Sequence, residues 1–340
     1  MSKIRYFIGI DIASENFTTS VLINSDKSQS TAAFQNSPQG FEEFQQWLLQ
    51  QKINPHHSII CIEATGVYGE HLCYWLTARN FRIAVEPPLK VKRAFATSTH
   101  KNDEIDSRKI AEYAFRFQDE LHFWQPKEEV LEQIRVLLTT REQFVQQRTA
   151  NVNSLNMLKR KVVQTPMANE YYQSNIERLS KQIKNIEKEI QRLIDKDQHF
   201  KKTTSLLKSI PGVSILLAAN LLVVTDGFSN YLNYKQLAAY IGICPYEHRS
   251  GSSVYKRPRS ARYGPARLRK LLCLAARSVK THKRPFKLYF LQKSAQGKDA
   301  SLILNNISNK LLKISCAVIK NQIPYHENYQ SVNPVLLNNT

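Results

Sequence analysis

The first 125 residues alternate between short apolar runs and amphipathic segments. Two β-rich runs at 4–12 and 17–24 flank the polar turn ASEN, a pattern that predicts a β-hairpin. Apolar residues in 38–51 recur at helical spacing and predict an amphipathic helix. The other elements expected here are a buried strand at 58–66, a helix at about 69–79 and a strand at 81–87. Strands alternating with helices predict a layered α/β domain with a partly parallel sheet.

From about 127 to 200 the pattern changes to long helices rich in Gln, Lys, Glu and Asn. An apolar seam advances there by alternating steps of three and four, through Ile176, Leu179, Ile183, Ile186, Ile190 and Leu193. The seam is too short for an independent rod, so it predicts an antiparallel hairpin with a helix at 128–162, or a dimer contact. We expect four segments: an α/β domain at 1–126, a helical connector and oligomerisation element at 127–202, a mainly α domain at 203–325 and a disordered tail at 326–340.

The charge balance indicates a polyanionic partner. Among 340 residues, 48 Lys and Arg oppose 28 Asp and Glu, giving a formal net charge of +20. An acidic membrane surface is the weaker alternative, because the basic residues do not flank a hydrophobic anchor. The five cysteines form no zinc-type cluster and read as buried residues of a reducing compartment. With no signal peptide and no apolar run of membrane-spanning length, we expect a cytoplasmic protein.

Four carboxylates are candidates for a metal site. Asp11 ends the first apolar strand, Glu63 lies inside an otherwise apolar strand, and Asp103 and Asp106 lie three apart at a helix start. The three aspartates have ordinary explanations, because a strand-end aspartate starts turns and an aspartate at a helix start caps it, whereas Glu63 inside a strand is costly unless it is paired or binds a cation. Together they form a set of hard oxygen ligands suited to Mg²⁺ or Mn²⁺ and to two-metal phosphodiester chemistry. Spacing alone leaves four further acids available: Glu15, Glu70, Glu104 and Asp119.

The region after 203 carries features that suit contact with a nucleic-acid backbone. Ile-Pro-Gly-Val, with Gly212, joins two apolar helical segments, as in a helix-hairpin-helix element or an ordinary helical turn. From Arg249 to Lys287 there are thirteen Lys or Arg and no acid, which predicts salt-sensitive phosphate binding. The basic residues we assign to it are Arg249, Lys256, Arg257, Arg259, Arg262, Arg267, Arg269 and Lys270.

Three N-terminal motifs, GIDIASENF, IEATGVYGEHL and KNDEIDSRKIAEYA, occur in the order and spacing of a known family. With PGV, QLAAYIGICP and GPARLRKLL further on, the chain resembles bacterial insertion-sequence transposases related to the Piv DNA invertases. The resemblance implies a RuvC-like, ribonuclease H-like domain whose four metal-binding acids fall on Asp11, Glu63, Asp103 and Asp106.

In the C-terminal part, the resemblance implies a serine nucleophile immediately before a glycine. In RSGSS that position is Ser250, with Ser252 and Ser253 as close competitors, because the family's commoner form is Ser-Gly-Gly-Lys. The implied reaction is DNA recombination through a phosphoserine link, without ATP. The implied partners are donor and target DNA, a structured guide RNA, and further copies of the chain in a dimer or tetramer.

Two other functions fit parts of the pattern. A RuvC-like, structure-specific DNA endonuclease would use the same four acids with water as the nucleophile. A non-catalytic regulator that binds RNA or DNA would need neither the acids nor Ser250. We expect a transposase/recombinase, because the acidic and serine motifs occur together.

Overall fold

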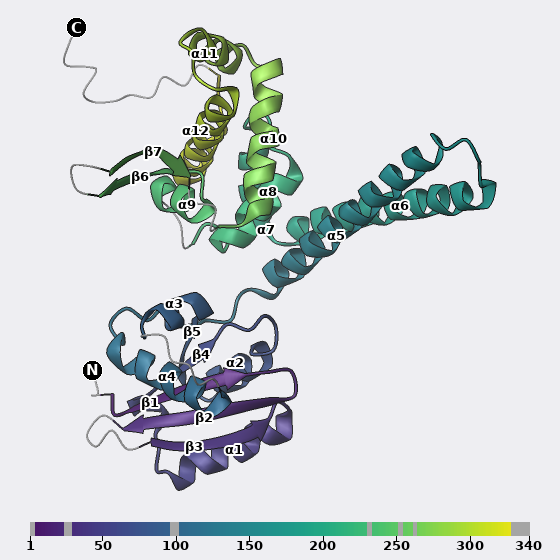
Figure 1. The fold of residues 1–340 in the computed structure, drawn as a ribbon. Coiled ribbons are helices and arrows are strands. Elements are labelled where there is room, and N and C mark those ends of the chain that lie inside the picture. The colour runs from purple at the N-terminus through teal and green to yellow at the C-terminus, as the bar shows by residue number, and fades with distance from the viewer. Residues whose placement is uncertain are drawn as a thin grey trace, which may run out of the picture. The chain divides into compact units, whose positions relative to one another are not determined.

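The computed structural model describes residues 4–23, 29–95, 102–229, 233–250, 254–260 and 264–327. Its contacts divide the chain into two compact units, 1–126 and 127–340, and each unit is described by itself (Figure 1).

The N-terminal unit is built on one mixed five-stranded sheet in the order β3-β2-β1-β4-β5. β1 pairs antiparallel with β2, as the hairpin pattern predicts, and parallel with β4, which pairs parallel with β5. β2 also pairs antiparallel with β3, a strand that the sequence analysis missed. The strands are β1 (Tyr6–Ile12), β2 (Asn16–Ile23), β3 (Gln29–Gln35), β4 (Ser58–Glu63) and β5 (Arg82–Glu86).

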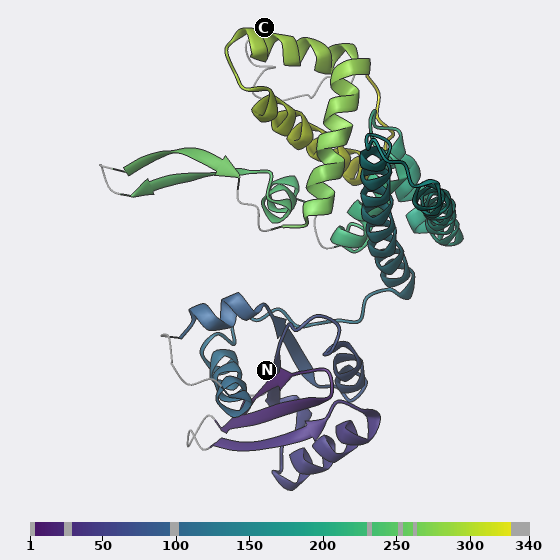
Figure 2. The ribbon, with the colours of Figure 1, turned by 45° about the vertical axis from the view of Figure 1, so that its right-hand side comes forward.

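Helices cover both faces of this sheet, so the unit has three layers (Figure 2). One face packs on α1 and α2 through residues such as Phe44 and Leu72, and the other packs on α3 and α4 through Val91 and Ala111. The alternation of side chains along each strand explains both cores, because successive residues face opposite layers. The helices are α1 (Pro38–Gln50), α2 (Glu70–Thr77), α3 (Pro88–Arg93) and α4 (Asp103–Arg116).

The second unit begins with two long helices, α5 (Glu129–Leu158) and α6 (Pro166–Lys196), which pack on each other as a hairpin. Leu179, Ile183 and Ile190 of the heptad seam are buried within this one chain, so the hairpin alternative is the one observed. At its base the hairpin shares a core with the helices that follow, through residues such as Ile134 and Ile194. The finer division into connector, C-terminal domain and tail stays a prediction, and most of the tail lies outside the described residues.

The rest of the second unit is mainly helical, as expected, with one two-stranded antiparallel sheet that the sequence pattern did not predict. The helix α12 is long and apolar enough to cross a membrane by length and composition, but half of its apolar window is buried in this core. The elements are α7 (Gln198–Lys208), α8 (Ile215–Thr225), α9 (Tyr234–Ile241), β6 (Pro245–Ser250), β7 (Val254–Ser260), α10 (Ala266–His282), α11 (Arg284–Ala295) and α12 (Ala300–Asn321).

Candidate active site

Asp11 and Glu63 lie at the ends of neighbouring parallel strands and on the same face of the sheet. Ile10 pairs with Ile62, so Asp11 and Glu63 follow in the same register. The residues two positions earlier, Gly9 and Cys61, face α4, and side-chain alternation puts both acids on that face. Both side chains are half-buried. The two acids therefore come from adjacent strands of the sheet.

The apolar run at 58–66 suggested that Glu63 lies in the middle of a strand, and the structure corrects this. β4 ends at Glu63, and the chain turns away through Gly66, whose φ is +71°. The strand end is fastened by two hydrogen bonds: the Ala64 N–H donates to the Glu86 carbonyl over 2.9 Å, and the Thr65 hydroxyl donates to the Ile12 carbonyl over 2.9 Å. Glu63 therefore avoids the full cost of burial that a mid-strand carboxylate would carry.

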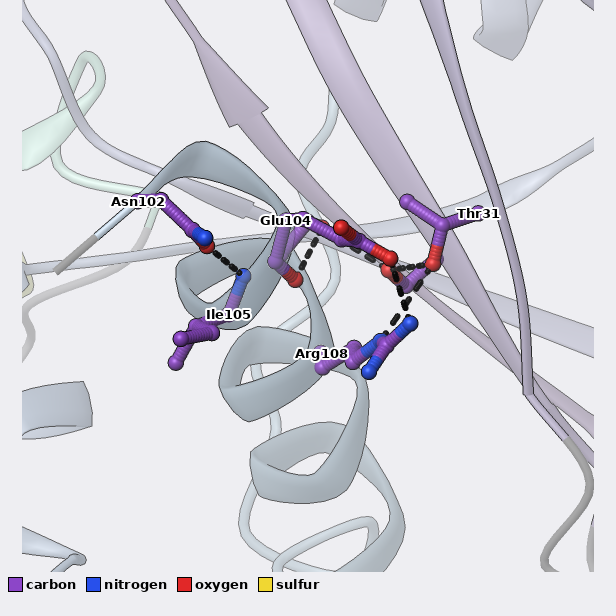
Figure 3. Close-up of polar contacts among 7 residues, drawn as sticks. Thr31, Asn102, Glu104, Ile105 and Arg108 are labelled. Carbon is purple, nitrogen blue, oxygen red and sulfur yellow. Dashed lines mark hydrogen bonds and ion pairs between the residues drawn. The ribbon is translucent and has the colours of Figure 1, made fainter. Parts of the chain in front are cut away.

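The helix α4 brings Asp103 and Asp106 to the same layer. Its cap is Asn102, whose side chain accepts from the Ile105 N–H over 2.7 Å (Figure 3). Neither aspartate is needed as the cap, which removes the simplest structural explanation for the pair. Asp103 is exposed, whereas Asp106 is half-buried and lies 3.4 Å from the Lys109 ammonium.

A chain of hydrogen bonds fixes α4 on the sheet. The Ser107 hydroxyl lies 2.8 Å from that of Ser20, which lies 3.0 Å from that of Thr31. Arg108 donates to Thr31 over 3.4 Å and forms an ion pair with Glu104 (Figure 3). Because the Ser20–Ser107 bond is buried, it holds the start of α4 in one position over β2.

Glu86 is a further acid at this face, and the sequence analysis did not single it out. It pairs in register with Glu63 and is only 4% exposed. Lys90 reaches it over 3.1 Å and neutralises it. Burial lowers the pKa of Lys90, but its interactions with Tyr113 and Glu86 outweigh burial and raise it above the ordinary value. An acid inside a strand-end VEP pattern was the available signal, and the ion pair with the exposed Lys90 makes the buried Glu86 a structural neighbour of the candidate site.

The acids do not form a ready-made cation cage. Among the residues that the structure describes, no group of three or more His, Cys, Asp or Glu side chains is arranged to hold a metal ion. The chemistry of the donor set still fits a hard divalent cation, because all four candidates are carboxylates and Asp11 and Glu63 lie on the face that α4 covers.

Ser250 is the last residue of β6, and its backbone pairs with Val254, the first residue of β7. Ser250 and Val254 therefore lie at one end of a two-stranded antiparallel sheet in an otherwise helical unit. The competitors Ser252 and Ser253 lie outside the described residues, as does Arg262. The other basic candidates of the hairpin lie in its strands: Arg249 in β6, and Lys256, Arg257 and Arg259 in β7.

Two candidate nucleic-acid contacts have clear packing roles. Arg269 donates to the backbone carbonyls of Ile241 and Gly264 over 2.9 and 2.6 Å, which fixes the entry to α10. Gly212 has φ +81°, and a Cβ there would come within 2.7 Å of Val279. Both residues are needed for the fold, and a role in binding nucleic acid stays a prediction. Arg267 and Lys270 lie on α10 beside a cavity that also involves α5.

Comparison with known proteins gives matches along most of the chain. Residues 8–161 match a family described as a transposase, and residues 204–291 match the transposase family IS116/IS110/IS902.

Individual relatives agree with these family matches. The chain is 30% identical to the pilin gene-inverting protein of Moraxella lacunata over 94% of its length and 98% of the relative. The same identity and coverage are found with the pilin gene-inverting protein of Moraxella bovis. The transposase for insertion sequence element IS1111A of Coxiella burnetii is 26% identical over 54% of this chain and 56% of the relative.

Proposed function

The chain belongs to the IS110-type family of transposases and invertases and is a DNA transposase/recombinase; we propose that it acts through a serine–phosphate intermediate assisted by a divalent metal. The observation that carries the proposal is the common placement of Asp11 and Glu63 on the face where α4 begins. The five-stranded mixed sheet with helices on both faces supports a RuvC-like fold for this unit.

The metal-binding residues of the proposal are Asp11, Glu63, Asp103 and Asp106. Their carboxylates suit Mg²⁺, with Mn²⁺ as a substitute, and Glu86 is already neutralised by Lys90. A divalent cation bound there would supply positive charge that offsets the negative charge developing on the phosphate.

The nucleophile of the proposal is the hydroxyl of Ser250. It attacks a DNA phosphorus atom, the bond from phosphorus to the 3′-oxygen breaks, and the proton lost by the serine ends on that oxygen. The products are a phosphoserine link and a free 3′-hydroxyl. After strand exchange, a 3′-hydroxyl attacks the phosphorus, the serine–phosphate bond breaks, and the serine regains its proton. The number of phosphoester bonds is unchanged, so no ATP is required.

The acids and Ser250 belong to different units, so we propose that they meet between two copies of the chain in a dimer or tetramer. The hairpin of α5 and α6 is the proposed assembly element. Its seam is covered within the chain, but apolar residues at its far end are exposed, including Val162, Val163 and Met167. Exposed apolar side chains gathered at one end of a hairpin suit contact with another copy.

The proposed partners are donor and target DNA and a structured guide RNA in the cytoplasm. Base pairing to that RNA would choose the sequence, while the protein holds the backbone. The basic stretch from Arg249 to Lys287 supports the second part, because it can neutralise several phosphates.

The experiment is a recombination assay with purified protein, RNA transcribed from the flanks of the element, and Mg²⁺. Ser250→Ala abolishes recombination and cutting, Asp11→Asn and Glu63→Gln do the same, and Ser252→Ala and Ser253→Ala serve as matched controls that stay active. Strand cutting that survives Ser250→Ala would show instead an endonuclease that uses water. Biological activity that survives Asp11→Asn and Glu63→Gln would show a non-catalytic regulator.

A further inference from the structure

A cavity of about 380 Å³ lies between α5, the start of α8, and α10. Its charged lining residues are Arg141 and Glu142 from α5, and Arg267 and Lys270 from α10. Gly212 and Ser214, at the turn before α8, complete one side. Three cations from two separate helices therefore converge on one hollow.

Two of these cations are paired and one is not. Arg141 forms an ion pair with Glu187 over 2.7 Å, and Lys270 forms one with Glu142 over 3.0 Å.

Arg267 forms no salt bridge within the described residues. Its one hydrogen bond runs from Nη2 to the Thr139 hydroxyl over 3.5 Å, and its buried Nε has no acceptor. Burial lowers the pKa of Arg267, while Glu142 raises it and Arg141 lowers it by smaller amounts. A guanidinium with an unused buried donor next to a second guanidinium is a site that an anion would stabilise.

The start of α8 points further donors at the same side of the cavity. Ser214 caps the helix by accepting from the Leu217 N–H over 3.3 Å. The preceding N–H groups, of Ile215 and Leu216, have no acceptor inside the helix because of helix geometry. Leu216 also lines the cavity, so the positive end of this 11-residue helix adds to the field of the cations.

We propose that this cavity seats one backbone phosphate of bound DNA, held by Arg267, Arg141, Lys270 and the first N–H groups of α8. A tetrahedral phosphate accepts from several directions at once, and the forked guanidinium of Arg267 offers two parallel donors to it. Glu142 and Glu187 keep two of the cations in place before the phosphate arrives. The inference rests on the proposed function and adds to it a defined contact outside the basic hairpin of β6 and β7.

One consequence is that the long helices serve DNA binding as well as assembly. Arg141 belongs to α5, so the hairpin contributes directly to the DNA surface of the second unit.

The test measures DNA binding by the full-length protein as a function of salt. Fluorescence anisotropy with a labelled DNA duplex of arbitrary sequence gives the slope of the logarithm of affinity against the logarithm of salt concentration. Arg267→Gln lowers the magnitude of that slope by about 0.9, the value for one lost phosphate contact. Arg141→Gln gives the same loss, and the double variant loses no more, because both residues hold one phosphate. Arg267→Lys retains the slope.

One control variant and one further test variant complete the design. Arg178→Gln removes one charge from an exposed part of α6 and leaves the slope at the wild-type value. Lys270 is largely exposed, so Lys270→Gln carries little risk of misfolding and lowers the slope as Arg267→Gln does. The measurements repeated in a Ser250→Ala background give the same changes, which separates the seat from the serine chemistry.

Several outcomes would overturn the inference. If Arg267→Gln keeps the wild-type salt slope while the wild-type protein binds and recombines DNA, the phosphate site is refuted and the proposed function is not affected. Additive losses in the double variant mean separate phosphates. A loss seen only with a matched RNA duplex assigns the seat to RNA and contradicts its assignment to DNA.

Discussion

Replacing Gly9 with alanine is the substitution that most directly tests how the candidate site is positioned. Gly9 lies in β1, two residues before Asp11, and α4 crosses directly over it. A Cβ at this position would come within 2.2 Å of both the Ala111 nitrogen and the Ser107 carbonyl oxygen. Both are backbone atoms of α4, so no side-chain rotation can relieve the overlap.

The size of the effect follows from these distances. An ordinary Cβ contact begins at about 3.4 Å, so α4 must withdraw by roughly 1.2 Å (3.4 minus 2.2) or the strand must bend. A gap of about 0.5–1 Å already forfeits a quarter to a half of the dispersion energy of each contact, so this withdrawal costs at least that share across the interface. We expect Gly9→Ala to lower the free energy of unfolding of the N-terminal unit by about 3 kcal/mol.

The assay uses a favourable distribution of tryptophan. All three tryptophans, Trp47, Trp75 and Trp124, lie in the N-terminal unit, so their fluorescence in urea follows that unit alone. Gly69→Ala is the matched control, because its Cβ would meet nothing closer than 3.6 Å, and we expect it to cost less than about 1 kcal/mol. A Gly9→Ala protein as stable as Gly69→Ala would refute the close packing of α4 on β1 and the placement of the acids that depends on it.

Three further predictions concern a buried hydrogen bond, a buried thiol and the assembly contact. Ser107→Ala removes the buried hydrogen bond to Ser20, while Ser20 keeps its hydrogen bond to Thr31. We expect the free energy of unfolding measured by tryptophan fluorescence to fall by about 1 kcal/mol, and an unchanged value would contradict the role of this bond in holding α4 on the sheet. Burial raises the pKa of Cys73 from about 9 to about 12, so the thiol loses its proton first in the unfolded state and the free energy of unfolding falls as pH rises through that window. Cys73→Ala reduces the slope of the free energy of unfolding against pH, and an unchanged slope would contradict the assignment. The double change Val162→Glu and Val163→Glu lowers the mass of the oligomer in light scattering while helix content is kept, and Gln182→Glu is the exposed control; an unchanged mass would exclude this end of the hairpin as the assembly contact.

The sequence predicted the elements whose apolar residues repeat clearly. The hairpin of β1 and β2, the buried strand β4 and the amphipathic α1 all follow from periodicity, and so does the pairing of α5 with α6. β3 was missed because QSTAAFQ is short and mostly polar, with Phe34 as its one large apolar residue. The hairpin of β6 and β7 was missed because VYKRPRS combines three cations with a proline, a composition that seldom marks a strand.

The sequence named the candidate residues of the site but not their geometry. Parallel pairing of β1 with β4 puts Asp11 and Glu63 side by side, and no local pattern reveals which strands will be neighbours. The ion pair of Lys90 with Glu86 depends on tertiary structure in the same way. The two residues are four positions apart, but the burial of Glu86, which gives the pair its importance, comes from the sheet and the helices that cover it. The cavity at Arg267 combines residues more than 120 positions apart and has no signature in the sequence.

The most direct test of the central claim mixes two inactive proteins, Asp11→Asn and Ser250→Ala, in a DNA-adduct assay. If the acids of one subunit serve the serine of another, each mixed assembly contains one site with intact acids and an intact Ser250. The account predicts that neither variant alone forms a covalent protein–DNA adduct and that the mixture does, with the DNA attached at Ser250. A mixture of Asp11→Asn with the double variant Asp11→Asn/Ser250→Ala should stay inactive. Mixed assemblies that form but yield no adduct, while wild-type protein does, would contradict the shared site.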